Sequence, residues 1–186
     1  ITYARRIQKA ILPPQDYIDE FLPENFVLYK PKDIVAGDFY WLEAVNEEPK
    51  NNSLITARSE LLKEFVFVAA ADSTGHGVPG AMVSVVCSNA LNRAVLEFGL
   101  RDTGKILDKT TDLVLETFKK SGEDIKDGMD ISLLAINTRE KTLSWSGANN
   151  SLWYVEPSGC EINEIKADKQ PVGKSDLRKP FTTHHI

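Results

Sequence analysis

The sequence has only two cysteines among its 186 residues, Cys87 and Cys160, and they lie far apart. Two isolated cysteines exclude a disulfide framework, and the apolar neighbours of Cys87 are typical of a buried thiol. No apolar run approaches the roughly 18 residues of a membrane-spanning helix. Positive charge is not in excess either, since 22 Lys and Arg face 27 Asp and Glu for a net charge of −5. This balance argues against binding nucleic acid or anionic lipid through a cationic face.

The overall composition, 42% hydrophobic and 26% charged, is typical of one soluble domain with a real core. The first segment places Ala4, Ile7 and Ile11 on one face of a helix that Pro13 would end. Arg5, Arg6 and Lys9 interrupt it, so it is not a signal peptide. Because the chain does not start with Met, we expect a piece of a larger protein. Residues 1–14 are predicted to connect it to an upstream module, and residues 15–186 to form the domain; the alternative is a first helix packed on its own domain. We expect a reducing, cytoplasmic location, including the cytoplasmic part of a membrane-attached protein.

Periodicity and composition predict strands, then two helices, then more strands. The expected helices are 79–99 and 104–120, the second with Thr103 as its N-cap. Residues 46–52 should form a loop, and 53–62 are ambiguous. The expected strands are 26–30, 39–45, 64–71, 131–137, 142–146, 151–155 and 161–166. Short turns between the strands of 131–155 indicate an antiparallel meander, and the apolar run in 64–71 implies cover on both faces. This order favours an α+β fold in which one sheet packs on another and the helix pair covers an outer face.

Two segments carry candidate chemistry. Gly37-Asp38 stands at the head of an expected strand, and a glycine-rich loop, DSTGHGVPG at 72–80, joins a buried strand to a helix. An acidic residue at the end of a buried strand needs a compensating charge, and Mg²⁺ or Mn²⁺ favours oxygen ligands. The alternative is that Asp72 merely caps a tight turn. Ser73 and His76 are too close in sequence to indicate a catalytic triad, and no phosphate-binding glycine pattern is present.

The sequence resembles the bacterial SpoIIE-type serine phosphatases, a metal-dependent group similar to protein phosphatase 2C. The resemblance rests on six segments in the family's order, which together span nearly the whole chain: YARRIQKAILP at 3–13, KPKDIVAGDFYW at 30–41, DSTGHGVPGA at 72–81, DGMDI at 127–131, GANN at 147–150 and DKQPVG at 168–173. It implies an antiparallel β-sandwich flanked by helices in α-β-β-α layers, which agrees with the layers expected above.

The resemblance also implies roles for single residues. Asp72 resembles the carboxylate that bridges two Mn²⁺ or Mg²⁺ ions, the Ser73 carbonyl a backbone ligand, and Asp38 a second acidic ligand. A metal-activated water would then attack the phosphoryl group. Asp127, or as an alternative Asp130, would hold a third metal. His76 belongs to the motif without being a ligand.

The activity implied is hydrolysis of phosphoserine or phosphothreonine on a signalling partner such as an anti-sigma-factor antagonist. An upstream sensor would act through the N-terminal helix, and a homodimer is compatible with it. Lys30 and Lys32 lie near Asp38 in the sequence and are the candidate phosphate-binding residues. The family pattern continues with an Asp-Gly element and a final acidic strand that this sequence does not contain. The C-terminal part of the fold is therefore expected to be missing, with weak metal binding and little turnover.

Two other functions stay open. One is a catalytically incomplete, phosphatase-like interaction module, although a scaffold has no need of Asp38 and Asp72. The other is a nucleotide cyclase, which also uses paired acidic residues and metals. The sequence shows no evident purine-binding or triphosphate-binding element for the second.

Overall fold

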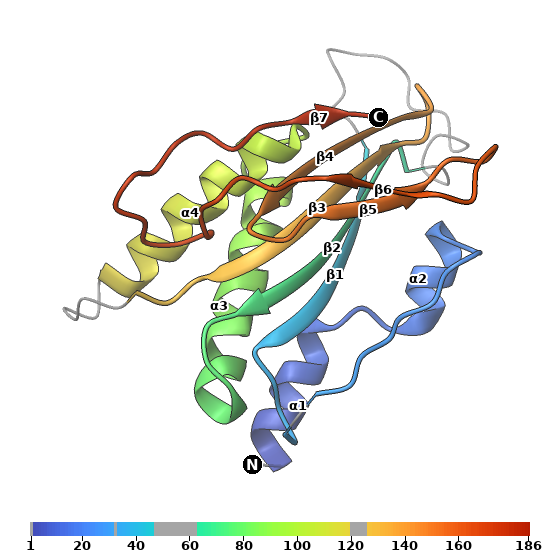
Figure 1. Ribbon diagram of the computed structural model, residues 1–186. Coiled ribbons are helices and arrows are strands. Elements are labelled where there is room, and N and C mark those ends of the chain that lie inside the picture. The colour runs from blue at the N-terminus through green and yellow to red at the C-terminus, as the bar shows by residue number, and fades with distance from the viewer. Residues whose placement is uncertain (1, 32, 47–62, 120–125) are drawn as a thin grey trace, which may run out of the picture.

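A single antiparallel sheet organises the chain. The computed structural model describes residues 2–31, 33–46, 63–119 and 126–186. The sheet has the strand order β1-β2-β3-β4-β7 (Figure 1). Its strands are β1 (Asp38–Val45), β2 (Phe65–Ser73), β3 (Met129–Asn137), β4 (Thr142–Ala148) and β7 (His184–His185). A separate hairpin pairs β5 (Leu152–Val155) with β6 (Ile162–Ile165). Four further elements are helices: α1 (Thr2–Ile11), α2 (Gln15–Phe21), α3 (Gly77–Leu96) and α4 (Thr103–Lys119).

One face of the sheet is covered by α3 and α4, and we call it the helix-covered face (Figure 1). Alternate strand residues point to this side, because successive side chains of a strand point to opposite faces. The strands contribute Phe67 and Leu133, and the helices contribute Leu91 and Ile106, all with no exposed surface. These side chains form the main hydrophobic core.

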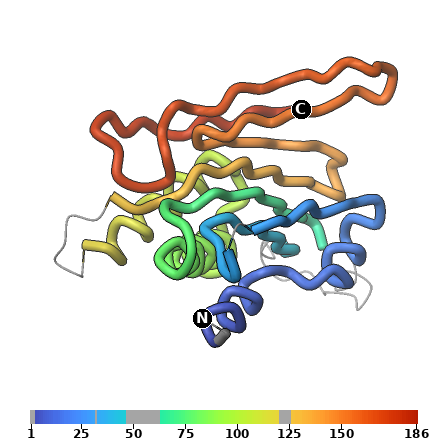
Figure 2. Tube along the Cα trace, turned by 60° about the horizontal axis from the view of Figure 1, so that its bottom comes forward, coloured from blue at the N-terminus to red at the C-terminus, as the bar shows by residue number. Residues whose placement is uncertain are grey.

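The opposite face, which carries Tyr40, Val68, Ala70, Ser132 and Leu134, is only partly covered, and we call it the open face. Helix α2 covers one end of it, where Ile18 packs with Leu42 and Val66. The β5–β6 hairpin reaches it beside β3, where Leu152 shares a cavity with Leu134. Figure 2 shows α1 and α2 at the β1 edge of the sheet and the C-terminal segment at the other edge.

Most of the expected elements are confirmed, and the α+β fold with an antiparallel sheet and flanking helices is correct. The meander was wrong in its last step, because β5 pairs with β6 and not with β4. Within the described residues the second sheet of the expected sandwich is this hairpin. Cover on both faces of β2 is also only half correct, since Val66 is buried but Ala70 is exposed.

Residues 26–30 are not a strand, contrary to expectation. The segment follows Pro23 and precedes Pro31, and Phe26 is 90% exposed. Its β-prone residues have no partner strand among the described residues, so no ladder forms. Helix α2 was not expected, because seven residues between two prolines are too few to show helical periodicity.

The N-cap of α4 also differs from the prediction. Asp102 Oδ1 accepts a hydrogen bond of 2.9 Å from the Lys105 backbone N–H, while Thr103 Oγ1 accepts one from Ser146. The expected loop at 46–52 and the ambiguous segment 53–62 lie outside the described residues, apart from Asn46.

A buried side chain of the first helix is hydrogen-bonded to the segment that leads into the sheet. The Gln8 amide is buried and forms two hydrogen bonds with Ala36: Nε2 donates to the carbonyl at 2.5 Å, and Oε1 accepts from the N–H at 3.1 Å. This contact joins α1 to Ala36, which lies two positions before the first residue of β1 in the sequence. Among the described residues, none of the helices has the length and apolar character needed to cross a bilayer.

Candidate metal site on the open face

Three acidic residues stand side by side at one end of the sheet. Asp38 of β1 is the register partner of Asp72 of β2, and Asp72 is the partner of Asp130 of β3. Side chains that are directly opposite in an antiparallel pair lie on the same face. The alternation of Tyr40, Ala70 and Ser132 places this row on the open face. Three carboxylates from distant parts of the sequence therefore share one end of it.

The electrostatics of this row are unfavourable without a cation. Although Asp72 keeps contact with solvent, partial burial raises the pKa of its carboxyl, and a hydrogen bond with Asp38 and the charges of Asp38 and Asp130 raise it further. Two such carboxylates need either a shared proton or a cation between them. Asp130 is held in place by Asn149, whose Nδ2 donates to Oδ1 at 2.8 Å.

The glycine-rich loop after β2 is packed tightly against the head of β1. Ser73 is buried, and its hydroxyl donates to the carbonyl oxygens of Gly37 at 2.7 Å and Gly80 at 3.2 Å. A Cβ at Gly37 would lie 2.5 Å from the Ser73 carbonyl oxygen and 2.6 Å from that of Gly75. Only glycine at position 37 permits this approach. The Ser73 carbonyl therefore lies beside the residue that precedes Asp38.

The predicted site residues are distributed unevenly. Asp38 and Asp72 are adjacent, Ser73 follows directly, and Lys30 lines a cavity of about 800 Å³ on the open face that also contains both carboxylates. Asp127 is different: burial, and after it the charge of Asp127, raises the pKa of the Cys87 thiol in the core, and Asp127 is not among the residues lining either cavity beside Asp72. Lys32 lies outside the described residues.

Two residues beside Asp72 and Asp130, Lys126 and Asn149, are not predicted from the sequence as site residues. A cavity of about 300 Å³ beside Asp72 is lined by Lys126 and Asp130, and Asn149 orients the latter. The sequence predicts Asp130 only as the alternative to Asp127, and the choice between them stays a prediction. The alternation in β3 could have favoured it, since Ile131 and Leu133 are apolar while Asp130 and Ser132 are polar and share the other face.

The donor set fits part of a metal site. Two carboxylates and a backbone carbonyl are the oxygen ligands that Mg²⁺ and Mn²⁺ prefer. In the part of the chain that the structure describes, however, no three His, Cys, Asp or Glu side chains come close enough together to hold an ion. The described residues thus supply a cluster of two carboxylates, Asp38 and Asp72, with Asp130 next to it.

Solved structures of phosphatase domains are similar to this chain over most of its length. The SiaA-PP2C domain of Pseudomonas aeruginosa matches with a TM-score of 0.73 and 26% identity, over 99% of this chain and 64% of that one. The PP2C phosphatase domain of SpoIIE from Bacillus subtilis, with a fragment of its regulatory domain, matches with a TM-score of 0.57 and 14% identity, over 82% and 38%. The structure of RsbX in complex with magnesium matches with a TM-score of 0.50 and 18% identity, over 80% and 67%.

This chain therefore spans less than two thirds of the first two of these structures. The comparison with curated proteins returned no match. The family model of stage II sporulation protein E (SpoIIE) matches residues 63–186. That range begins just before β2 and includes the loop after it, the two helices of the core and every later strand. The chain thus belongs to the SpoIIE family, and its fold is that of a PP2C-type phosphatase domain.

Proposed function

We propose that this chain is part of a metal-dependent phosphatase that removes phosphate from serine or threonine of a partner protein. The observation that carries the proposal is the register pairing of Asp38 with Asp72 beside the glycine-rich loop. Family membership supports the reaction class, and a signalling protein such as an anti-sigma-factor antagonist is the proposed substrate. The proposed cofactors are two Mn²⁺ or Mg²⁺ ions, and the proposed location is the cytoplasm.

Asp38, Asp72 and the Ser73 carbonyl would hold the metal. A divalent cation bound there lowers the pKa of coordinated water and offsets charge on phosphoryl oxygens. The protein positions its ligands through the backbone: Ser73 donates from its N–H and its hydroxyl to Gly37, next to Asp38. Lys30 lies on the same cavity as both carboxylates and is the proposed phosphate-binding residue. In Lys30→Ala we expect a higher KM for phosphopeptide; an unchanged KM would remove the role.

A third metal is proposed at Asp127, with Asp130 as the alternative. The register of β2 and β3 favours Asp130, which is directly opposite Asp72. The Mn²⁺ concentration that gives half-maximal activity distinguishes the two. It should rise in the variant that lacks the true ligand, Asp127→Ala or Asp130→Ala, and stay unchanged in the other.

The N-terminal helix is proposed to connect an upstream regulator to the site. Gln8 holds Ala36 by two hydrogen bonds, and Ala36 is two residues from Asp38, so a shift of α1 would be transmitted to β1. Removal of residues 1–12 should change either the rate of phosphate release or the oligomeric state, which analytical ultracentrifugation measures. If it changes neither, the proposed connection and the proposed homodimer both fail.

A second candidate function is an interaction module whose site is too incomplete to act. It is favoured by the absence, among the described residues, of a third side chain close enough to complete a metal site. Such a module would bind its partner protein without releasing phosphate.

The deciding experiment is Mn²⁺-dependent release of phosphate from a phosphoserine peptide. It compares this chain, a version extended at its C-terminus along the natural protein, and the Asp72→Asn variant of whichever is active. Activity that needs Mn²⁺ and is lost in Asp72→Asn supports the phosphatase. Folded proteins that release no phosphate in any form support the interaction module.

A further inference from the structure

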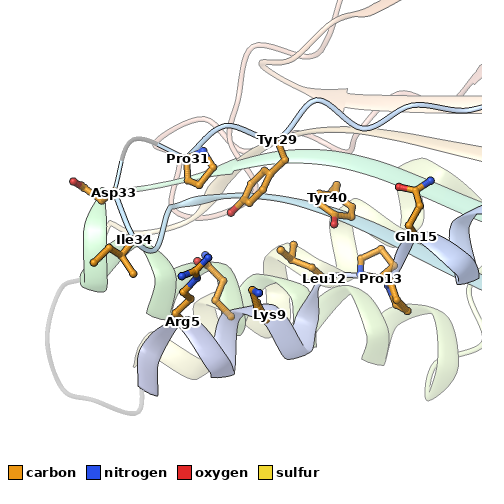
Figure 3. Close-up of a pocket in the computed structure, with 12 residues that line it drawn as sticks. Arg5, Lys9, Leu12, Pro13, Gln15, Tyr29, Pro31, Asp33, Ile34 and Tyr40 are labelled. Carbon is orange, nitrogen blue, oxygen red and sulfur yellow. The ribbon is translucent and has the colours of Figure 1, made fainter. Parts of the chain in front are cut away.

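A third cavity lies near the carboxylate row. It has a volume of about 870 Å³ and lies between α1, the residues Tyr29, Pro31, Asp33 and Ile34, and Tyr40 of β1 (Figure 3). Its walls combine apolar groups, such as Leu12, Pro13 and Ile34, with charged and aromatic side chains. Neither the metal ligands nor the proposed phosphate-binding residue line it.

The charge of this cavity is mainly positive. Arg5 and Lys9 are exposed and lie one turn apart on α1, on the side of the helix that faces Tyr29 and Tyr40 (Figure 3). Neither forms an ion pair with any residue that the structure describes. Like charges at this spacing repel each other, so a bound anion would relieve the repulsion. The lining also contains one carboxylate, Asp33, which offsets one of these two positive charges.

An aromatic wall links this cavity to the carboxylates. Tyr29 and Tyr40 form an edge-to-face pair with ring centroids 5.6 Å apart. The Tyr29 hydroxyl donates a hydrogen bond of 3.1 Å to the backbone carbonyl of Asp38. Both tyrosines also line the open-face cavity that contains Asp38 and Asp72. A ligand that lies across the two rings can therefore occupy both cavities at once.

We propose that the cavity beside α1 binds an acidic side chain of the protein substrate, within a few residues of the phosphorylated one. The inference rests on the proposed phosphatase function and names a class of substrate for it. The apolar and aromatic walls suit a polypeptide segment, whereas a free inorganic anion would contact only Arg5 and Lys9. The chain as a whole has a net charge of −5, so Arg5 and Lys9 supply the local positive charge that an acidic segment needs.

Binding is tested first without catalysis. The probe is a fluorescent, unphosphorylated peptide with a run of glutamates, and the readout is anisotropy in metal-free buffer. The variants are the double substitution Arg5→Glu with Lys9→Glu, and Arg6→Glu as a matched control on the same helix that does not line the cavity. All three side chains are exposed, so the thermal midpoint should not change.

We expect the double variant to bind the peptide at least tenfold more weakly, and Arg6→Glu to change the affinity less than twofold. A peptide with glutamine in place of glutamate should bind the wild-type chain at least tenfold more weakly. Equal binding of the two peptides overturns the proposal, and so does an equal loss in Arg6→Glu, which would indicate a nonspecific effect of surface charge.

A kinetic experiment separates this inference from the proposed function. With active protein, we expect the KM for a phosphoserine peptide flanked by glutamates to be at least tenfold below the KM for its glutamine counterpart. In the double variant, the two KM values should become nearly equal. If the glutamate peptide binds as expected but no protein releases phosphate, only the phosphatase proposal fails. If phosphate is released and the KM is the same for the glutamate and the glutamine peptide, only the acidic-segment proposal fails.

Discussion

The two faces of the five-stranded sheet differ in what covers them. On the helix-covered face, Leu133 of β3 has no exposed surface and packs into the core with α3 and α4. On the open face, the next residue, Leu134, is half-buried and lines a cavity that also contains Asp38 and Asp72. The comparison indicates that one face supplies most of the stability and that the other can hold charged groups close together.

The largest effect is expected from a pair of neighbours on β3. Leu133→Ala removes a fully buried side chain and should lower the free energy of unfolding by about 2–5 kcal/mol. Leu134→Ala on the open face should cost about 1 kcal/mol, because less of its apolar surface is buried. Urea denaturation followed by circular dichroism measures both. Equal losses would mean that the open face is packed as tightly as the other.

The next effect concerns the contact between β1 and the glycine-rich loop. In Gly37→Ala the new Cβ would lie 2.5 Å from the Ser73 carbonyl oxygen, so β1 and the loop must separate. We expect a loss of about 1–3 kcal/mol and weaker Mn²⁺ binding, measured by denaturation and calorimetry. Gly159→Ala is the control, since its nearest neighbours would lie 3.9 Å away. A Gly37→Ala variant as stable as Gly159→Ala would contradict the close packing.

A smaller effect, of opposite sign, is expected at the carboxylate row. The raised pKa of Asp72 means that the native state binds more protons than the unfolded state between the usual carboxyl pKa and the raised one. Stability must then fall as the pH rises through this window. In Asp72→Asn, without metal, this loss should be absent, and the gain near neutral pH should stay below about 1 kcal/mol because solvent screens the charges. Thermal midpoints of both proteins in EDTA, from pH 4 to pH 8, measure the difference. Parallel curves would show that Asp72 is not under strain from its neighbours.

The smallest effect is expected from chemical labelling of the two thiols, which lie in very different surroundings. Cys87 of α3 is fully buried beneath the helix-covered face, and burial together with the charge of Asp127 raises its pKa to about 12. Cys160, in the turn of the β5–β6 hairpin, is exposed. Iodoacetamide at pH 8 should therefore modify only Cys160 in the native protein and both thiols in guanidinium, by mass spectrometry. Rapid native labelling of Cys87 would show that α3 opens readily.

Local patterns were sufficient to predict most of the elements. The helices α3 and α4 and the strand β2 have long, strongly periodic or apolar segments, and their predicted bounds differ from the observed ones by a few residues at most. Local reasoning failed where pairing decides the structure. The β-prone residues 26–30 lie between prolines without a partner strand among the described residues, and β5 pairs forward with β6.

The candidate site shows the same division. Asp38 and Asp72 were singled out by their places at the ends of expected strands beside glycines, the family resemblance implied their roles, and the structure places them opposite each other. The sequence predicts Asp127, with Asp130 as the alternative, as the ligand of a third metal, and this choice stays a prediction. The pairing that places Asp130 opposite Asp72 depends on strand register, which composition alone does not reveal. A shift of one residue along β3 changes the face on which a side chain lies. Likewise, no local pattern could bring Arg5 and Lys9 of α1 to the same cavity as Tyr40.

The central claim is that Asp38 and Asp72 form the cation-binding end of the open face. Titration of the ¹⁵N-labelled chain with Mn²⁺ tests it directly, because the paramagnetic ion broadens the amide signals near its site without requiring turnover. The account predicts that the signals of residues 37–39, 72–74 and 129–131 broaden first, and that those of α4 stay sharp. Broadening that begins elsewhere, or that is unaffected by Asp72→Asn, would contradict it.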